Sequence, residues 1–175
     1  MKRPEVHIDR LGAADEADLD AVEAIARACF PEAFSAREEL GRPWAVLWAA
    51  RLAEAAANDP RPPPVGFLVA WHVADELHVL NVATEPSLRR RGIGRALMDF
   101  ALAYAAAHRV RIVLLEVRRS NRAAIKLYRD LGFTALGVRP RYYADNDEDA
   151  IEMILGLDPD TGRFLAGRDE IRIDG

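Results

Sequence analysis

Two different spacings of apolar residues mark the first part of the chain. A short apolar run at residues 6–8 predicts a strand, whereas from Leu19 to Phe30 apolar residues recur every three or four positions. That spacing places them on one face of an amphipathic helix, which we expect to run from about residue 15 or 18 to residue 30. Pro31 follows directly and ends the helix, because proline cannot donate the next backbone hydrogen bond.

Two more helices are expected before a proline-rich stretch. Ser35 and Glu38 have the spacing of a capping box, which predicts a short helix that Gly41 closes. A further helix is predicted after Pro43, because five apolar residues would share one of its faces. They are Trp44, Leu47, Trp48, Leu52 and Ala55. Residues 58–64 contain four prolines and are expected to form a stiff surface connection.

The rest of the chain alternates strand-like and helix-like runs. The expected strands are short apolar runs bounded by turn residues, and they cover residues 65–73, 76–83, 112–117, 133–140 and 150–157. Helical spacing predicts one helix that ends near residue 108 and another over residues 121–131, capped by Ser120 and ended by Gly132. This order predicts a single α/β or α+β domain with a mixed central sheet over residues 1–157. Residues 158–175 are turn-rich and polar, and we expect a poorly ordered tail.

Composition favours a cytoplasmic globular protein. The chain has 175 residues, of which half are apolar and 30% are charged. Its single cysteine, Cys29, cannot form a disulfide within the chain and is expected in the core. No apolar run approaches membrane-spanning length, and no signal-peptide pattern opens the sequence. The four histidines lack metal-ligand spacing, so we expect no metal.

Charge is distributed unevenly along the chain. The formal net charge is −4, yet between Arg89 and Arg129 the only acidic residues are Asp99 and Glu116. Residues 144–149 are strongly acidic instead. A local basic zone within an acidic protein favours a small anionic ligand over nucleic acid, which usually requires a broadly basic surface.

The segment Arg89-Arg-Arg-Gly-Ile-Gly-Arg95 lies in this basic zone, between an expected strand and an expected helix. Its glycines let the backbone approach a ligand closely, and the N-terminus of the helix adds unpaired N–H groups. Together with the arginines, these features are typical of a phosphate-binding loop. Leu97 stands where the dinucleotide fingerprint needs a third glycine, and no Gly-Lys-Ser/Thr follows, so neither of the two best-known glycine loops is present.

Two motifs carry a resemblance to a known family. Arg89-x-x-Gly92-x-Gly94 resembles the Arg/Gln-x-x-Gly-x-Gly/Ala signature of the GNAT superfamily of N-acetyltransferases, which binds the pyrophosphate of acetyl-coenzyme A (acetyl-CoA). Glu116 to Phe133, ending in Leu-Tyr-x-x-Leu-Gly-Phe, resembles the strand–helix–strand segment of that superfamily. Further segments are similar to the RimI type, the ribosomal-protein-alanine N-acetyltransferases. They are residues 81–84, 139–143 and 148–153.

The resemblance implies a GNAT-like fold, in which helices flank a mixed central sheet, and it implies acetyl-CoA as the acetyl donor. It also implies a set of donor-binding residues, with the backbone of residues 82–84 pairing with pantetheine. The set is Val82, Ala83, Thr84, Arg89, Arg90, Arg91, Gly92, Ile93, Gly94, Arg95 and Asn121. For Asn121, capping of the following helix is the alternative role.

Glu116 and Tyr128 are the candidate catalytic pair. Glu116 ends an otherwise apolar strand, and the resemblance implies that it is the general base, directly or through water. The alternative is an ion pair with Arg118 or a neighbouring arginine. Tyr128 lies on the apolar stripe of its helix, so it could simply pack in the core. The resemblance implies that its hydroxyl is the general acid, and we expect both roles together.

The part of the chain expected to bind the acceptor departs from the family pattern. The resemblance implies that Arg139, Tyr142 and Tyr143 bind the N-terminus of a peptide, and the following acidic loop could attract a cationic one. An insertion at residues 32–42 and a short loop at 144–149 depart from the family pattern in the part that selects the substrate. We expect acetyl transfer to the N-terminal α-amine of a protein, most simply an alanine-starting ribosomal protein, by a monomer. The alternatives are a small amine as acceptor, a non-catalytic CoA-binding sensor, and an RNA-binding protein.

Overall fold

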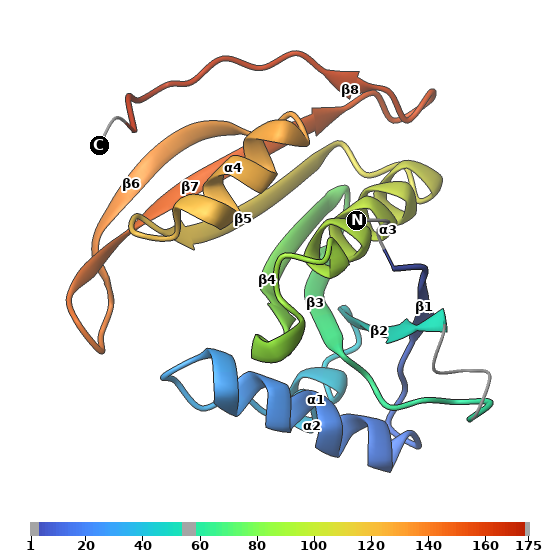
Figure 1. Ribbon diagram of the computed structural model, residues 1–175. Helices are drawn as coiled ribbons and strands as arrows, with labels where there is room; N and C mark the ends of the chain where they lie inside the picture. The colour runs from blue at the N-terminus through green and yellow to red at the C-terminus, as the bar shows by residue number, and fades with distance from the viewer. Residues whose placement is uncertain (1–3, 54–58, 174–175) are drawn as a thin grey trace. The chain divides into compact units, whose positions relative to one another are not determined.

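Eight strands form a mixed sheet in a computed structural model that describes residues 4–53 and 59–173 (Figure 1). The strand order is β1-β2-β3-β4-β5-β7-β6, with β8 beside β7. The strands are β1 (Val6–Arg10), β2 (Ala45–Leu52), β3 (Gly66–Val73), β4 (Glu76–Thr84), β5 (Ile112–Arg118), β6 (Thr134–Tyr143), β7 (Glu148–Leu157) and β8 (Phe164–Leu165). This confirms the predicted fold class.

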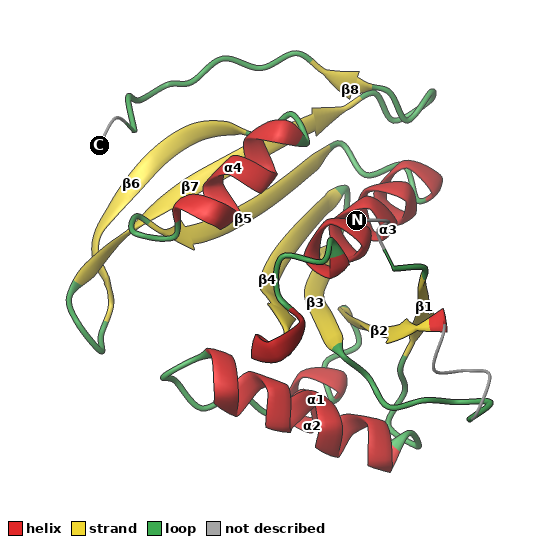
Figure 2. Ribbon diagram, viewed as in Figure 1, coloured by secondary structure: helices red, strands yellow, loops and turns green. Residues whose placement is uncertain are grey.

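Four α-helices accompany the sheet within the described residues (Figure 2). They are α1 (Glu16–Cys29), α2 (Ala36–Leu40), α3 (Ile93–Ala107) and α4 (Arg122–Asp130). A short 3-10 helix, Pro86–Leu88, leads from β4 into the glycine-containing loop. The contacts of the chain divide into two units, one within residues 1–71 and 80–101 and the other within residues 72–79 and 102–175. Each unit holds part of the predicted site.

The first unit corrects one prediction, because the expected helix after Pro43 is strand β2. Residues Ala45–Arg51 are all buried, and β2 pairs antiparallel with β1 along one edge and with β3 along the other. A strand covered on both faces has no polar alternation, so its apolar residues matched a helical spacing by chance. Trp48 is 2% exposed and packs edge-on against Phe100 of α3. Ala55, which was assigned to the same helix, lies outside the described residues.

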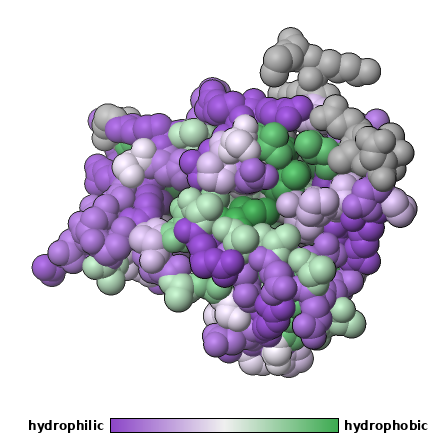
Figure 3. Space-filling view, turned by 60° about the horizontal axis from the view of Figure 1, so that its bottom comes forward, coloured by the Kyte–Doolittle hydropathy of each residue, from purple (hydrophilic) through white to green (hydrophobic). Residues whose placement is uncertain are grey.

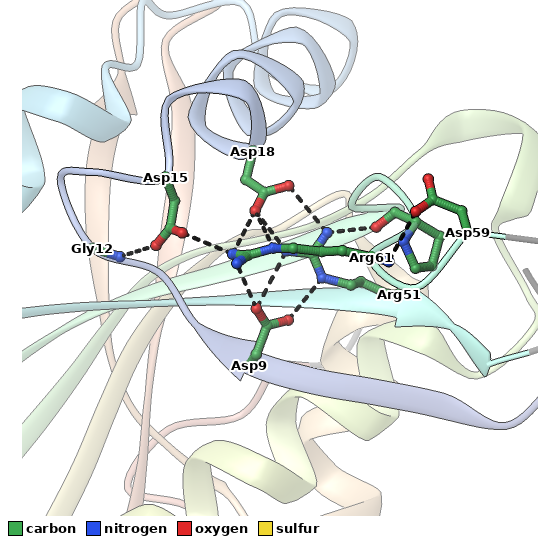
Figure 4. A network of polar contacts seen from close by, with 8 residues as sticks. Asp9, Gly12, Asp15, Asp18, Arg51, Asp59 and Arg61 are labelled. Atoms are coloured by element: carbon green, nitrogen blue, oxygen red, sulfur yellow. Dashed lines mark hydrogen bonds and ion pairs between the residues drawn. The ribbon is translucent and has the colours of Figure 1, made fainter. Parts of the chain in front are cut away.

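A buried ion-pair network holds β2 to its neighbours (Figure 4). Arg51 is 3% exposed, and its guanidinium contacts Asp9 of β1 at 2.9 Å and Asp18 of α1 at 2.8 Å. It also donates to the backbone carbonyl of Pro62. Arg61 lies 2.7 Å from Asp18, on the solvent side of the same network. The hydrogen bond from Arg51 lowers the pKa of Asp18, so this carboxylate stays ionised within the network.

In the second unit, α4 begins one residue later than predicted. Its N-cap is Asn121, whose side-chain oxygen accepts a hydrogen bond from the Ala124 N–H at 3.2 Å. Ser120 was expected to be the cap, but its own N–H donates to the Glu148 carboxylate instead. Gly132 has φ of +98° and ends the helix, as predicted.

The segment after residue 157 contacts the sheet. β8 pairs antiparallel with β7, and the Asp169 carboxylate accepts a hydrogen bond from the Ala135 N–H at 2.8 Å. Asp169 also pairs with Arg129 of α4 at 2.9 Å. Residues 158–173, for which the sequence predicts poor order, therefore make specific contacts with β6, β7 and α4.

Hydrophilic side chains dominate one face of the molecule around a smaller hydrophobic area (Figure 3). No helix in the described parts of the chain is long and apolar enough to cross a membrane. Nor do the described His, Cys, Asp and Glu side chains gather in a group that could hold a metal ion.

We predict that Arg51→Met lowers the free energy of unfolding by about 3–5 kcal/mol, because it leaves Asp9 and Asp18 without their buried partner. Arg37→Met is the matched control. Arg37 also pairs with two acids of α1, Asp20 and Glu23, but its side chain is 40% exposed. Its loss should cost much less, because solvent screens an exposed ion pair. Urea unfolding of both variants measures this, and equal losses would contradict the assigned role of the network.

Candidate active site

The glycine-containing loop of the first unit turns sharply into α3. Arg90 has φ of +65° and Gly92 has φ of +89°, so the backbone passes twice through the left-handed region before Ile93 begins the helix. The first turn of α3 contains no acidic residue. Its N–H groups and the positive end of the helix dipole therefore have no carboxylate of their own turn to neutralise them. This local geometry suits an anion.

Gly94, in the first turn of α3, has no internal packing reason to be glycine. An added Cβ would meet only the Thr84 hydroxyl, at 3.9 Å, among the described atoms within 4 Å. Gly66 behaves differently, since a Cβ there would lie 2.8 Å from the carbonyl oxygen of Ala83 and 3.0 Å from Ile93. Glycine inside a helix costs about 1 kcal/mol relative to alanine. We therefore interpret the absence of a side chain at Gly94 as leaving the surface of the first turn open for a ligand.

Side chains around the loop are already tied to the protein. Arg95 pairs with Asp99 one turn along α3 at 3.1 Å. Arg89 is exposed, and its guanidinium donates to the sulfur of Cys29 at 3.3 Å. The Cys29 thiol in turn donates to the carbonyl oxygen of Thr84 at 3.5 Å. Cys29, which was expected only to pack in the core, thus links α1 to two segments of the predicted donor site.

In the second unit, the structure brings Glu116 together with two residues predicted to bind the acceptor. Tyr142 donates its hydroxyl to Glu116 Oε2 at 2.8 Å, and Arg139 Nη1 lies 3.1 Å from Glu116 Oε1. The Glu116 side chain is 30% exposed, so it remains accessible. The alternative role considered for Glu116 was an ion pair with Arg118 or a neighbouring arginine, and the arginine that contacts it is Arg139.

Arg118 belongs to a neighbouring cluster at the end of β6. Its guanidinium pairs with Asp145 at 2.8 Å and with Glu148 at 3.4 Å, and it lies 3.8 Å above the ring of Tyr143. Asp149 contacts Arg119 at 3.5 Å. Two aspartates of residues 144–149 are therefore engaged by arginines of the protein itself, which favours a structural role for these carboxylates over attraction of a cationic peptide.

Tyr142 and Tyr143 form an aromatic pair next to Glu116. Their rings meet edge to face at 5.2 Å, and Tyr142 is 45% exposed. The hydrogen bond to Glu116 raises the pKa of Tyr142, because ionising the phenol would place two negative charges together. Tyr142 therefore stays a hydrogen-bond donor and presents its ring to solvent.

Tyr128 is buried on α4, with 8% of its surface exposed, and packs against Phe133 with ring centroids 5.9 Å apart. Burial raises its pKa to about 12, so its hydroxyl is protonated at neutral pH, as a proton donor must be. The core-packing role is thus confirmed, and the acid role stays a prediction. For Asn121, the cap uses the side-chain oxygen and leaves the amide NH₂ as a separate donor.

Glu152 is a member of this cluster that the sequence did not single out. It lies directly opposite Glu116 in the antiparallel β5–β7 pair, and its Oε1 accepts a hydrogen bond from Arg139 Nε at 2.8 Å. The available signal was its position as an acidic residue between the buried Ile151 and Met153. Only the register of the two strands reveals that it faces Glu116.

Comparisons with known proteins relate the chain to acetyltransferases. A family model described as the acetyltransferase (GNAT) family matches residues 19–133. The ribosomal protein bS18-alanine N-acetyltransferase of Escherichia coli K12 is 42% identical over 93 residues, which is 52% of this chain and 63% of that protein. The match therefore spans less than two thirds of the length of this curated relative.

Solved structures extend the likeness over nearly the whole chain. The crystal structure of the ribosomal-protein-S18-alanine N-acetyltransferase from Escherichia coli has a TM-score of 0.75 and 27% identity, covering 96% of this chain and 99% of that one. The NatC complex bound to Gag peptide and CoA has a TM-score of 0.76 at 23% identity, covering 87% and 99%, and shows the fold alone. The family model spans the glycine-containing loop, Glu116 and Tyr128, and on this basis the chain belongs to the GNAT family of acetyltransferases.

Proposed function

We propose that this protein is an acetyl-CoA-dependent N-acetyltransferase that modifies the N-terminal α-amine of a protein, with an alanine-starting ribosomal protein as its target. The observation that carries the proposal is the contact of Glu116 with both Tyr142 and Arg139. It joins the candidate base to two candidate acceptor-binding residues. The relatives from Escherichia coli act on alanine of a ribosomal protein, which supports this choice of acceptor.

The donor is assigned to the loop at residues 89–95 and to the backbone of residues 82–84. The open first turn of α3 and the surrounding arginines fit a pyrophosphate, and the end of β4 offers backbone groups that pantetheine can pair with as a strand does. We assign the side-chain amide of Asn121 as an additional hydrogen-bond donor to the bound acetyl-CoA. When bound, acetyl-CoA supplies an acetyl group activated as a thioester, and an N–H at the end of β4 would stabilise the oxyanion.

Acetyl transfer in a ternary complex requires two proton transfers. The amine nitrogen forms a bond to the thioester carbon, the carbon–sulfur bond breaks, and the amine loses a proton. We assign that proton to Glu116, directly or through one water. The departing sulfur takes a proton from Tyr128. An α-amine has a pKa of ~8 and is about one tenth neutral at pH 7, so a base is useful but need not be strong.

We predict that Gly94→Ala stabilises the fold by up to about 1 kcal/mol and yet weakens CoA binding about tenfold or more. The new methyl group meets only the Thr84 hydroxyl, at an ordinary van der Waals distance of 3.9 Å, but occupies the surface left for the ligand. Gly12→Ala is the matched control, because its Cβ would also meet nothing nearer than 3.8 Å. Thermal unfolding and calorimetric titration with CoA measure the two effects. Unchanged CoA affinity in Gly94→Ala would contradict the loop assignment.

We predict that Glu116→Gln and Tyr128→Phe each lower kcat by about 10²–10⁴-fold, the usual contribution of a general acid or base. The assay is thiol release from acetyl-CoA with a peptide that copies the N-terminus of the ribosomal protein. The same peptide with a blocked α-amine is the substrate control, and Glu76→Gln and Tyr104→Phe are the protein controls. An unchanged rate after both active-site substitutions together would refute the catalytic assignment. If acetyl-CoA releases its thiol only when small amines are supplied, the acceptor is a small amine and not a protein N-terminus.

The raised pKa of Tyr128, about 12, leads to a separate prediction about kcat at alkaline pH. A general acid must be protonated, and this phenol loses its proton only well above the ordinary tyrosine value of about 10. At saturating acceptor, kcat should therefore hold from pH 8 to about pH 10.5 instead of falling. A decline that begins near pH 9 in the wild type, and that disappears in the residual activity of Tyr128→Phe, would contradict the prediction.

A further inference from the structure

The cluster around Glu116 contains two carboxylates and one bridging guanidinium. Glu116 and Glu152 are directly paired across β5 and β7, so their side chains leave the sheet on the same face. The Cβ atoms of such a pair lie ~4.5–5.5 Å apart, and two like charges at that separation repel. Arg139 of β6 relieves the repulsion, because its Nε binds Glu152 at 2.8 Å while its Nη1 lies 3.1 Å from Glu116.

The backbone of β6 is shaped around Glu152. Gly137 is the register partner of Glu152, and a Cβ at this glycine would lie 2.8 Å from Glu152 Oε2. The pairing of β6 with β7 also shifts register between Ala135 and Gly137, and again between Arg139 and Tyr143. Any residue larger than glycine at position 137 would therefore displace the carboxylate that holds Arg139.

Other charged groups of this unit are engaged with different partners. On β5 itself, Arg118 contacts Asp145 and Glu148. On the β4 side, Glu76 and His78 pair with each other at 2.6 Å, opposite Ile112 and Leu114.

On β6, Tyr142 donates to Glu116, and its ring lies 5.5 Å from the guanidinium of Arg139. On α4, Tyr128 is buried and Lys126 pairs with Asp130 at 3.0 Å. The groups that the structure places in contact with Glu116 are thus Arg139 and Tyr142, with Glu152 acting through Arg139.

This arrangement conflicts with the proposed role of Glu116 unless Arg139 can move. A carboxylate bound to a guanidinium is a poorer base, and the oxygen that Arg139 occupies is one that an acceptor amine needs. The Arg139 side chain is 51% exposed, so it can swing without disturbing the core. Its second bond, through Nε to Glu152, holds the arginine at the cluster when Nη1 leaves.

We propose that Glu152 is a positioning residue for the reaction under Proposed function, on which this inference rests. It holds Arg139 through Nε, so that the guanidinium leaves Glu116 when the acceptor amine arrives and returns after the product departs. Arg139 thereby compensates the negative charges of both glutamates in the free protein, and the cationic acceptor amine compensates the charge of Glu116 when it is bound.

Glu152→Gln removes the charge but keeps the shape of the side chain. Arg139 then has Glu116 as its only charged partner in this cluster and stays there. We expect KM for the acceptor peptide to rise about tenfold, and the acidic limb of kcat/KM to move to lower pH by about half a unit or more. Arg139→Gln leaves two facing carboxylates without their cation, so the limb should move to higher pH.

The decisive measurement is a double-mutant cycle of acceptor KM with Glu152→Gln, Arg139→Gln and the two combined. Glu152→Gln should raise KM only while Arg139 is present, and in the Arg139→Gln background its effect should vanish or reverse. An equal rise in both backgrounds would mean that Glu152 merely supports the sheet, and would overturn the proposal.

A second measurement does not depend on acetyl transfer. The carboxyl carbon of Glu116 can be followed by ¹³C NMR through a pH titration, with its signal assigned by its absence in Glu116→Gln. The midpoint should move down in Glu152→Gln and up in Arg139→Gln. Movement in the same direction, or none, overturns the inference. Opposite movement in a protein that transfers acetyl to no N-terminal peptide would refute the proposed acceptor and leave the coupling of these three residues established.

Discussion

The antiparallel ladder between β5 and β7 is the constraint on which the second unit depends. Its register runs without interruption from Ile112 opposite Gly156 to Arg118 opposite Ala150. Because side chains alternate between the two faces of a strand, a slip of one residue would send Glu116 to the other face of the sheet. The buried residues Val113, Leu115 and Val117 prevent that slip, since they would have to exchange places with partly exposed neighbours that include Glu116 and Arg118. Core packing thus determines where the proposed base points.

In the first unit, too, a buried core fixes the position of a candidate functional segment. Its core is built around β2, whose one buried polar side chain, Arg51, is matched by carboxylates from β1 and α1. The glycine-containing loop is anchored beside this core by Ile93, which is 1% exposed, and the backbone at Gly66 leaves no room for a Cβ beside Ala83 and Ile93. With its base held in this way, the first turn of α3 can stay open at Gly94. A rigid support and an uncovered helix N-terminus together favour anion binding.

Much of this architecture was predictable from local sequence. The hairpin of β3 and β4, the glycine loop before α3 and the closing Gly132 all follow from turn residues and spacing, because local backbone preferences decide them. Strand β2 was not predictable in this way, since burial on both faces removes the alternation of apolar and polar residues that identifies a strand. The N-cap was missed by one residue because Ser120 and Asn121 are both good caps, and the tertiary bond of Ser120 to Glu148 decides between them.

Some residues of the candidate site could likewise be predicted from sequence, and one could not. The glycine loop, Glu116 and Tyr128 stand in recognisable motifs. Arg139 and Tyr142 were predicted to bind the acceptor, which stays a prediction, and only the structure shows that both contact Glu116. Glu152 could not be found, because its role depends on strand register and on a glycine 15 positions earlier in the chain. Pairing between distant segments carries no local signature. The residue that tunes the proposed base is therefore the one that required the structure.

The charge balance of the cluster also bears on the class of acceptor. An amine reaches the site mainly as a cation, so it can replace the guanidinium of Arg139 at Glu116 without leaving a carboxylate uncompensated. It must then lose a proton to react. A lysine side chain, with a pKa of ~10.4, is harder to deprotonate than an α-amine of pKa ~8, by about 3 kcal/mol. Glu116 is 30% exposed and accepts a hydrogen bond from Tyr142, so it is not enclosed in an apolar pocket. A base in such an accessible place suits the more acidic amine, which favours a protein N-terminus over a lysine as the acceptor of the proposed reaction.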